Sequence, residues 1–248
     1  MTGYLCLGNG KTFIGEITMD EEDPVQGEIV FFTGMTGYQE VLTDPSYKDQ
    51  IVVFTYPLIG QYGVNEDDFE SSQPQVKGVI MLQSPALYSH YHASSSLKDY
   101  LQKWKIPFMT GVDTRQVVKA IRDVGTQNAC ISYTEVLPSK EKLTGQIEKV
   151  AFSQIRKMGS GNKHIAVVDF GVKKSIVSSL VKMDCLVTVI PYHQLELLDQ
   201  MNVDGMVLSN GPGDPKEMMS LLPKLKEKIM ELPTLGICLG HQLIALAL

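Results

Sequence analysis

Short apolar runs separated by turn residues fill the chain up to about residue 150, and two later segments there show helical spacing. The helical segments predict helices over residues 96–104 and 113–122, and Asp113 is a suitable N-cap for the second. The apolar runs predict strands over residues 4–7, 12–17, 27–32, 50–55 and 76–82. This part of the chain is therefore predicted to be α+β with a β-rich start.

Beyond about residue 163, nearly continuous apolar runs alternate with helical segments. The predicted strands cover residues 164–169, 185–190, 204–209 and 234–237, and the predicted helices cover residues 173–183, 194–201 and 216–230. Pro223 is expected to kink or split the last of these helices. Such alternation predicts an α/β arrangement in which helices cover both faces of a parallel sheet.

Between these two parts, residues 140–156 predict a charged amphipathic helix, and residues 159–162 predict a hinge or linker. We therefore expect a first domain over residues 1–158 and a second over residues 163–248.

Composition excludes several classes of protein. Hydrophobic residues make up 44% of the chain and charged residues 20%, which is typical of a globular protein. The net charge of −6 gives no footprint for nucleic acid, and no apolar run reaches the roughly 18 residues that a membrane span needs. The N-terminus lacks the pattern of a signal peptide, and the four scattered cysteines favour reduced thiols over disulfides or a metal site. We expect a cytoplasmic protein that binds no metal.

One cysteine lies in a pattern that carries chemistry. Cys238 follows a short apolar run, precedes an apolar helical segment, and has Gly236 and Gly240 two residues away on either side. This pattern is typical of a nucleophile elbow, in which a sharp strand–turn–helix holds a thiol out at the end of a sheet. The amides that open the following helix favour negative charge at that point. The alternative is an ordinary buried cysteine in a glycine-rich strand end.

A second loop, residues 209–215, follows the third predicted strand of the sheet. Ligands of such sheets bind beyond the carboxyl ends of the strands, where the Cys238 turn is also expected. The glycines of residues 209–215 allow backbone amides to approach a substrate and to hold an oxyanion. An ordinary tight turn would account for the same residues.

These patterns resemble a known family. Residues 236–242 resemble the nucleophile motif of class I glutamine amidotransferases, and residues 209–215 resemble their oxyanion and glutamine-binding loop. Residues 32–47 contain two glycines and small, hydroxylated residues, a composition that predicts a loop. Together with residues 50–60, they closely resemble the N-terminal domain of the carbamoyl-phosphate synthase small chain. Gln61 stands where that family commonly has asparagine, a change that keeps the amide chemistry.

The resemblance implies a chain that hydrolyses L-glutamine and passes ammonia to a large synthetase subunit, its partner, which uses bicarbonate, ATP and Mg. No cofactor is implied for this chain. The implied nucleophile is Cys238, and the implied glutamine contacts are Ser46, Gly211, Gly213, Leu239 and Gln242. In the family, a histidine base and its acidic partner come from strands well downstream of the elbow. We therefore expect a C-terminally truncated, inactive fragment with an incomplete second domain, and His241 is not expected to act as the base.

Two alternatives remain open at this point. Another class I amidotransferase, such as one serving anthranilate or guanylate synthesis, would share the cysteine motif but lack the domain that residues 32–60 resemble. A natural short form that binds the large subunit as a non-catalytic scaffold would share the cysteine motif and the N-terminal domain. The residues do not distinguish arginine from pyrimidine synthesis as the destination of the product.

Overall fold

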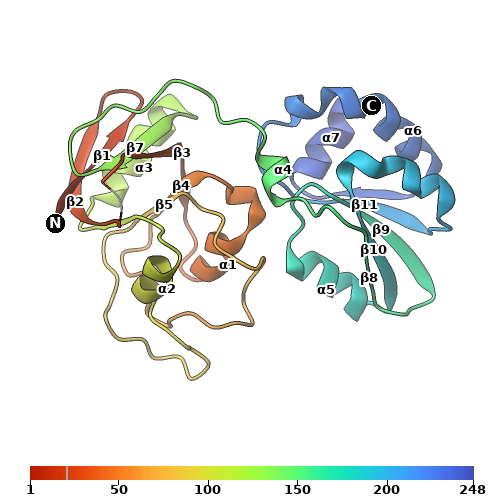
Figure 1. The fold of residues 1–248 in the computed structure, drawn as a ribbon, viewed down its shortest axis with the longest axis horizontal. Coiled ribbons are helices and arrows are strands. Elements are labelled where there is room, and N and C mark those ends of the chain that lie inside the picture. Colours follow the sequence, from red (N-terminus) through yellow and green to blue (C-terminus); the bar gives the residue numbers. More distant parts are fainter. Residues whose placement is uncertain (21) are drawn as a thin grey trace. The chain divides into compact units, whose positions relative to one another are not determined.

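The computed structural model describes residues 1–20 and 22–248, and the chain divides into two compact units, Met1–Leu143 and Thr144–Leu248 (Figure 1). Each unit has its own sheet and its own hydrophobic clusters. The mixed α/β architecture predicted from the sequence is confirmed.

In the first unit, the strands form a closed barrel in the order β1-β2-β6-β5-β4-β3-β7. Neighbouring strands from β3 through β4 and β5 to β6 are parallel, and the remaining pairs are antiparallel. The strands are β1 (Thr2–Leu7), β2 (Thr12–Thr18), β3 (Val25–Phe32), β4 (Gln50–Phe54), β5 (Gly78–Ile80), β6 (Phe108–Thr110) and β7 (Asn128–Ser132).

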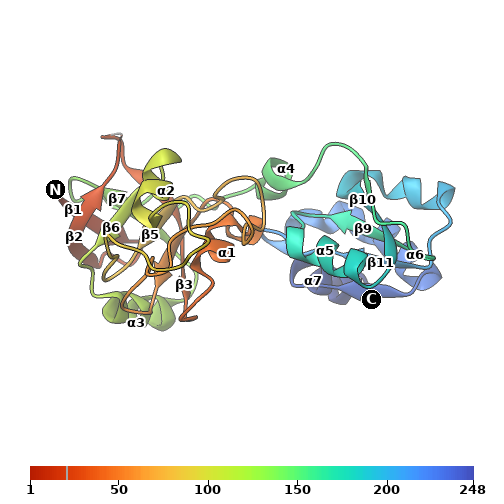
Figure 2. The same ribbon diagram turned by 90° about the horizontal axis from the view of Figure 1, so that it is seen from below.

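Strand β4 shows why this unit has two cores. Ile51 and Val53 belong to one cluster and Val52 and Phe54 to another, because successive side chains of a strand point to opposite faces. The first cluster includes residues of α3 (Thr114–Val124), and the second includes residues of α1 (Tyr38–Thr43) and α2 (Leu97–Lys103). Figure 2 shows these helices around the strands of the first unit.

The two helices predicted for this unit are present with their expected starts. The Asp113 carboxylate caps α3 by accepting from the Gln116 N–H at 3.0 Å, and the Ser96 hydroxyl caps α2 by accepting from the Asp99 N–H at 3.1 Å. Residues 38–47, which lie in a segment interpreted as a loop, instead form α1 and the 3₁₀ helix η1 (Pro45–Tyr47). The buried Tyr38 explains the difference, because the helix places this side chain in the core.

The second unit contains a five-stranded sheet in the order β12-β11-β9-β10-β8. Its first four strands are parallel, as predicted, and β8 adds an antiparallel edge. The strands are β8 (Arg156–Met158), β9 (Lys163–Asp169), β10 (Cys185–Pro191), β11 (Gly205–Leu208) and β12 (Thr234–Gly236). The helices are α4 (Gln146–Val150), α5 (Lys174–Lys182), η2 (Tyr192–Gln200), η3 (Pro215–Leu221), α6 (Leu222–Glu231) and α7 (Leu239–Ala247).

Both faces of this sheet are covered (Figures 1 and 2). Val168 and Leu208 pack in a cluster with residues of α6, α7, η2 and η3. Val167 and Val207, which point to the other face, pack in a cluster with residues of α5. Pro223 lies in the first turn of α6 and marks the expected split from η3.

The segment before the sheet corrects two predictions. The long helix expected over residues 140–156 is wrong, since only the short α4 forms there and residues 156–158 pair with β10. The compact units also divide between Leu143 and Thr144, whereas we expected the first domain to reach residue 158. The reason is tertiary, because Ile147 is buried in the second unit and the Phe152 N–H donates to the Asp169 carboxylate at 2.6 Å.

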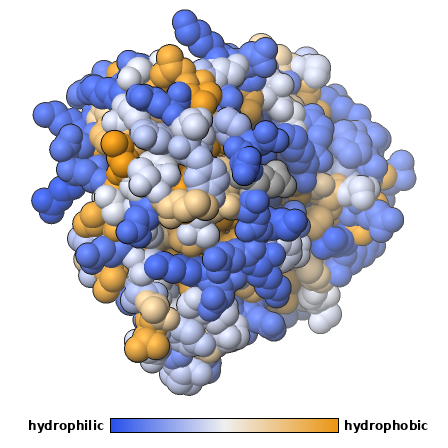
Figure 3. Space-filling view, turned by 60° about the vertical axis from the view of Figure 1, so that its left-hand side comes forward, coloured by the Kyte–Doolittle hydropathy of each residue, from blue (hydrophilic) through white to orange (hydrophobic). Residues whose placement is uncertain are grey.

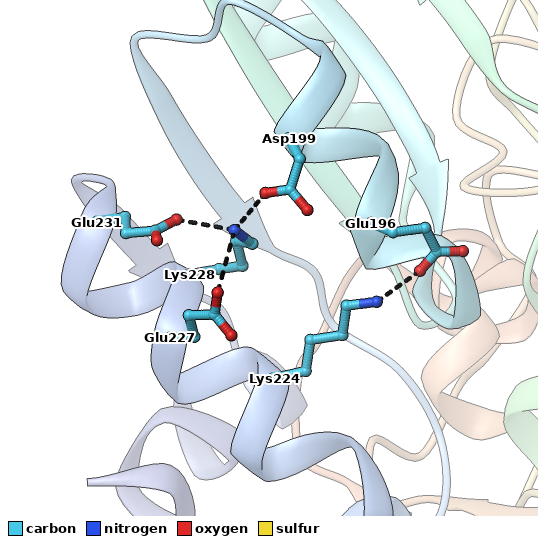
Figure 4. A network of polar contacts seen from close by, with 6 residues as sticks. All are labelled: Glu196, Asp199, Lys224, Glu227, Lys228 and Glu231. Carbon is cyan, nitrogen blue, oxygen red and sulfur yellow. Dashed lines mark hydrogen bonds and ion pairs between the residues drawn. The ribbon is translucent and has the colours of Figure 1, made fainter.

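A buried lysine joins α6 to η2 (Figure 4). The Lys228 side chain is 4% exposed, and its Nζ lies 2.5 Å from Asp199 Oδ1 and 2.8 Å from Glu231 Oε2. Hydrogen bonds to these two carboxylates, that to Asp199 first, hold the pKa of Lys228 above its usual range. The ammonium group is therefore charged throughout the neutral range.

Replacing Lys228 by alanine is expected to lower the thermal unfolding midpoint of the second unit by several degrees, because the carboxylates of Asp199, Glu231 and Glu227 lose their shared cation. Lys224→Ala is the matched control, since the Lys224 side chain is 42% exposed and has Glu196 as its partner. A group with a raised pKa contributes stability that is lost only as pH rises through that pKa, so the difference should stay constant between about pH 6 and pH 9. Equal midpoints for the two variants would contradict this role.

On the face drawn in Figure 3, hydrophilic and hydrophobic residues are interspersed. Within residues 1–20 and 22–248, no helix combines the length and apolar character that crossing a bilayer requires.

Candidate functional site at the Cys238 turn

Cys238 lies in the sharp turn between β12 and α7. Its backbone has φ 51° and ψ −108°, a conformation that residues with a side chain rarely adopt, and the residue is exposed. Such a strained, exposed position at a strand–helix junction is the geometry of a nucleophile elbow. The alternative of a buried cysteine is excluded at this position, whereas Cys6 and Cys130 are buried.

The two flanking glycines allow strand and helix to meet this closely. A Cβ on Gly236 would lie 2.6 Å from the His241 backbone nitrogen, and a Cβ on Gly240 would collide with the Leu208 carbonyl oxygen. The Gly240 N–H also donates to the Ser209 carbonyl oxygen at 3.0 Å, which ties the first turn of α7 to the end of β11. Glycine at both positions is therefore a requirement of packing.

The loop after β11 lies beside this turn. Gly211 is buried, and a Cβ added to it would collide with the Phe170 carbonyl oxygen and lie 2.9 Å from Leu239 Cδ2. Gly213 is exposed and has φ 88°, which glycine adopts readily. The backbone of Gly211 therefore lies against the residue that follows Cys238.

A buried polar network, which the sequence analysis missed, holds this edge of the sheet. The Asp169 carboxylate accepts from the Gly171 N–H at 2.8 Å and the Val172 N–H at 2.7 Å. The Asn210 side chain bonds the same loop, and both Asp169 and Asn210 are at most 2% exposed. The signal in the sequence is a polar residue at the end of a buried strand or just beyond it, since such a group needs a partner.

The structure places the residues expected at the site in both units. Leu239 and Gln242 lie in the first turn of α7 next to Cys238, where the Gln242 N–H donates to the Cys238 carbonyl oxygen at 3.1 Å. Leu239 is buried and Gln242 exposed. Ser46 lies in η1 of the first unit, where its N–H donates to the Asp44 carboxylate at 2.8 Å. Contacts within the second unit thus bring Gly211 and Leu239 together.

His241 and His164 do not complete a cysteine–histidine pair with Cys238. His241 is exposed on the first turn of α7, and among the described residues no hydrogen bond joins it to Cys238. His164 lies at the opposite end of β9 from Asp169, with Nε2 2.8 Å from Thr188 Oγ1. Outside residue 21, no group of three or more possible ligands is arranged to hold a metal ion.

Comparison with known families agrees with this division of the chain. Residues 5–131 match the model of the carbamoyl-phosphate synthase small chain, CPSase domain, and residues 166–248 match that of glutamine amidotransferase class-I. Cys238 and the loops after β9 and β11 lie within the second match.

Individual relatives match over the whole chain. The arginine-specific carbamoyl phosphate synthase small chain of Bacillus subtilis is 57% identical, and the chains of the same name from Geobacillus stearothermophilus and Halalkalibacterium halodurans are 51% and 47% identical. Each alignment covers all of this chain and 70% of the relative's length. The chain belongs to the carbamoyl-phosphate synthase small-chain family.

Proposed function

We propose that Cys238 is the nucleophile that hydrolyses L-glutamine in this chain. The observation that carries the proposal is the strained backbone of Cys238, with φ 51° and ψ −108°, at an exposed turn between β12 and α7. Such strain persists only where the surrounding structure enforces it, and here two glycines and a backbone hydrogen bond do so. The family match supports the same reading.

The chemistry follows from a thiolate beside backbone amides. The sulfur attacks the side-chain amide carbon of glutamine, and the C–S bond forms as the carbonyl oxygen becomes an oxyanion. The C–N bond then breaks, the nitrogen takes a proton and leaves as ammonia, and water converts the thioester to glutamate and free thiol. In the family that this chain resembles, the proton transfers are assigned to a histidine well downstream of the elbow cysteine.

We assign the oxyanion donors to the N–H groups of Leu239 and Gly211. The amide of the residue after the nucleophile is the usual first donor at an elbow, and the second comes from a neighbouring loop. The tight packing of Gly211 against the Leu239 side chain supports this pairing. Glutamine contacts are assigned to Ser46, Gly213 and Gln242, together with Gly211 and Leu239, on the basis of the resemblance.

The ammonia is proposed to pass to a carbamoyl-phosphate synthase large chain that uses bicarbonate and ATP. This partner follows from the family, whose relatives are named as the small chain of that enzyme. We further propose that the product serves arginine synthesis, because the three relatives at 47–57% identity are named arginine-specific. Relatives at 43% identity carry no such designation in their names.

Thiol labelling tests the glutamine site on this chain directly. Iodoacetamide is expected to alkylate the exposed Cys238 before the buried Cys6 and Cys130, and L-glutamine should slow the reaction at Cys238. The half-buried Cys185 is the control thiol, whose alkylation glutamine should leave unchanged. Mass spectrometry of the labelled peptides measures both rates. Equal rates at Cys238 with and without glutamine would argue against a substrate site there.

The assignment of Ser46 gives a separate test in the full-length protein paired with its large chain. Ser46→Ala is expected to weaken glutamine-dependent synthesis by about 0.5–1.5 kcal/mol, the value of one neutral hydrogen bond. Synthesis from added ammonium should not change. Steady-state rates with the two nitrogen sources measure the difference, and equal losses would instead indicate a role of Ser46 in folding or subunit docking.

A further inference from the structure

One buried side-chain amide joins two loops at the carboxyl edge of the sheet in the second unit. Asn210, which is 2% exposed, lies two residues after Leu208, the last residue of β11. Its Oδ1 accepts from the Lys173 N–H at 3.1 Å, and its Nδ2 donates to the Gly171 carbonyl oxygen at 3.0 Å. Both partners are backbone groups of the loop after β9, so Asn210 ties the loops after β9 and β11 together.

Neighbouring groups hold the same two loops in place. The Ser209 hydroxyl accepts from the Phe170 N–H at 3.0 Å and donates to the Asn210 carbonyl oxygen at 2.7 Å. The Asp169 carboxylate accepts from the Gly171 and Val172 N–H groups. The Asn210 side chain thus binds a loop whose own conformation Asp169 already sets.

Gly211 directly follows Asn210 in the chain. Its backbone lies so close to Phe170 that a Cβ would collide with the Phe170 carbonyl oxygen, and its other neighbour is the Leu239 side chain. A shift of the Asn210 backbone would therefore move the Gly211 amide relative to the turn that carries Cys238.

We propose that Asn210 is a positioning residue for glutamine hydrolysis, and that its side-chain amide sets the place of the Gly211 N–H beside Cys238. The inference rests on the proposed function, since it assigns a role at the same site. An oxyanion donor acts only if it is fixed before the charge develops, because reorganisation during the reaction would cost the free energy that the donor supplies. Asn210 supplies that fixation without touching the substrate.

The molecule offers a control at the amino-terminal ends of the same two strands. The Asp204 carboxylate accepts from the His164 N–H at 2.8 Å and the Lys163 Nζ at 3.0 Å, and so ties the turn before β11 to the start of β9. Asp204 therefore also joins β9 and β11 through a side chain, but far along the strands from Cys238. Asp204 is exposed whereas Asn210 is buried, so Asp204→Ala controls for the loss of a side-chain link between β9 and β11 and not for the loss of a buried group.

The experiment compares Asn210→Ala, Asn210→Asp and Asp204→Ala in the full-length protein with its large chain. For Asn210→Ala, kcat for glutamine hydrolysis is expected to fall about 10- to 100-fold with KM unchanged, because one oxyanion donor is worth about 100- to 1,000-fold and is here displaced, not removed. Ammonia-dependent synthesis and the rate of Cys238 alkylation should stay at their wild-type values. Asp204→Ala should leave kcat unchanged.

Asn210→Asp keeps the inference testable if the alanine variant fails to fold. It preserves the shape of the side chain and the oxygen that accepts from the Lys173 N–H. The introduced carboxylate cannot donate to the Gly171 carbonyl oxygen, whereas its protonated form can. Its glutaminase rate relative to wild type should therefore rise as the pH is lowered, while its ammonia-dependent rate relative to wild type should stay constant. A wild-type kcat in both variants, or equal losses with glutamine and ammonium, would overturn the inference.

Cys238→Ser is measured in parallel. If it retains glutamine hydrolysis, the proposed function fails and this inference fails with it. If it is inactive while both Asn210 variants match wild type, only the role of Asn210 is overturned.

Discussion

Replacing Cys238 by serine in the full-length protein, paired with its large chain, is expected to abolish glutamine-dependent carbamoyl phosphate formation. Loss of a nucleophile of this kind typically costs several orders of magnitude, and a serine hydroxyl ionises far less readily than a thiol. Synthesis from added ammonium should persist, because free ammonia bypasses the cysteine. Steady-state rates with each nitrogen source measure the two activities separately.

The same variant distinguishes chemistry from binding and folding. Serine is close to cysteine in size, so the exposed turn and the contacts assigned to Gly211, Gly213 and Gln242 should remain. Glutamine should still bind, as measured by calorimetry. Loss of both synthetic activities would mean that Cys238 is needed for structure, and retention of both would remove it from the mechanism.

The second large effect is expected from Gly240→Ala. In an ordinary helix interior this change stabilises by roughly 0.5–1 kcal/mol, because alanine has the higher helix propensity. Here the added methyl would collide with the Leu208 carbonyl oxygen, so α7 must move away from β11. We expect the free energy of unfolding to fall by about 1–3 kcal/mol, as for an overpacked core, measured by urea denaturation.

Because α7 begins directly after Cys238, Gly240→Ala should also remove the protection of this thiol by glutamine. Ala245→Gly is the matched control in the same helix, since Ala245 is exposed. It should cost roughly 0.5–1 kcal/mol through helix propensity alone and leave glutamine protection intact. A Gly240→Ala protein at least as stable as wild type would show that the close approach is not required.

Periodicity was sufficient to predict most of the regular elements. The apolar runs at residues 164–169 and 185–190 correspond to β9 and β10, and the capped segment after Asp113 corresponds to α3. These segments form where local preference and burial agree, since nearly continuous apolar strands need cover on both faces. The motif around Cys238 likewise predicted a strand–turn–helix, which β12 and α7 provide.

Local sequence pattern gave wrong secondary-structure predictions where long-range contacts determine the structure. Residues 140–156 carry charges at helical spacing, yet Arg156–Met158 is a strand because β10 offers it an antiparallel edge. Residues 38–43 have the small and polar neighbours of a loop, yet they form a helix because Tyr38 and Leu42 fill the core. In both cases tertiary burial outweighs a weak local preference.

The sequence by itself determined the α/β class, the alternation of the second unit, and the place of Cys238 between two glycines at the end of a strand. These features depend on residue type and spacing, which act over a few neighbours. Only the tertiary structure decided that 144–158 pack with the second unit, and that Asp169 and Asn210 bond backbone groups of one loop. Asn210 donates a hydrogen bond to Gly171, which lies 39 residues earlier in the chain. Only the parallel pairing of β9 with β11 brings the two residues together.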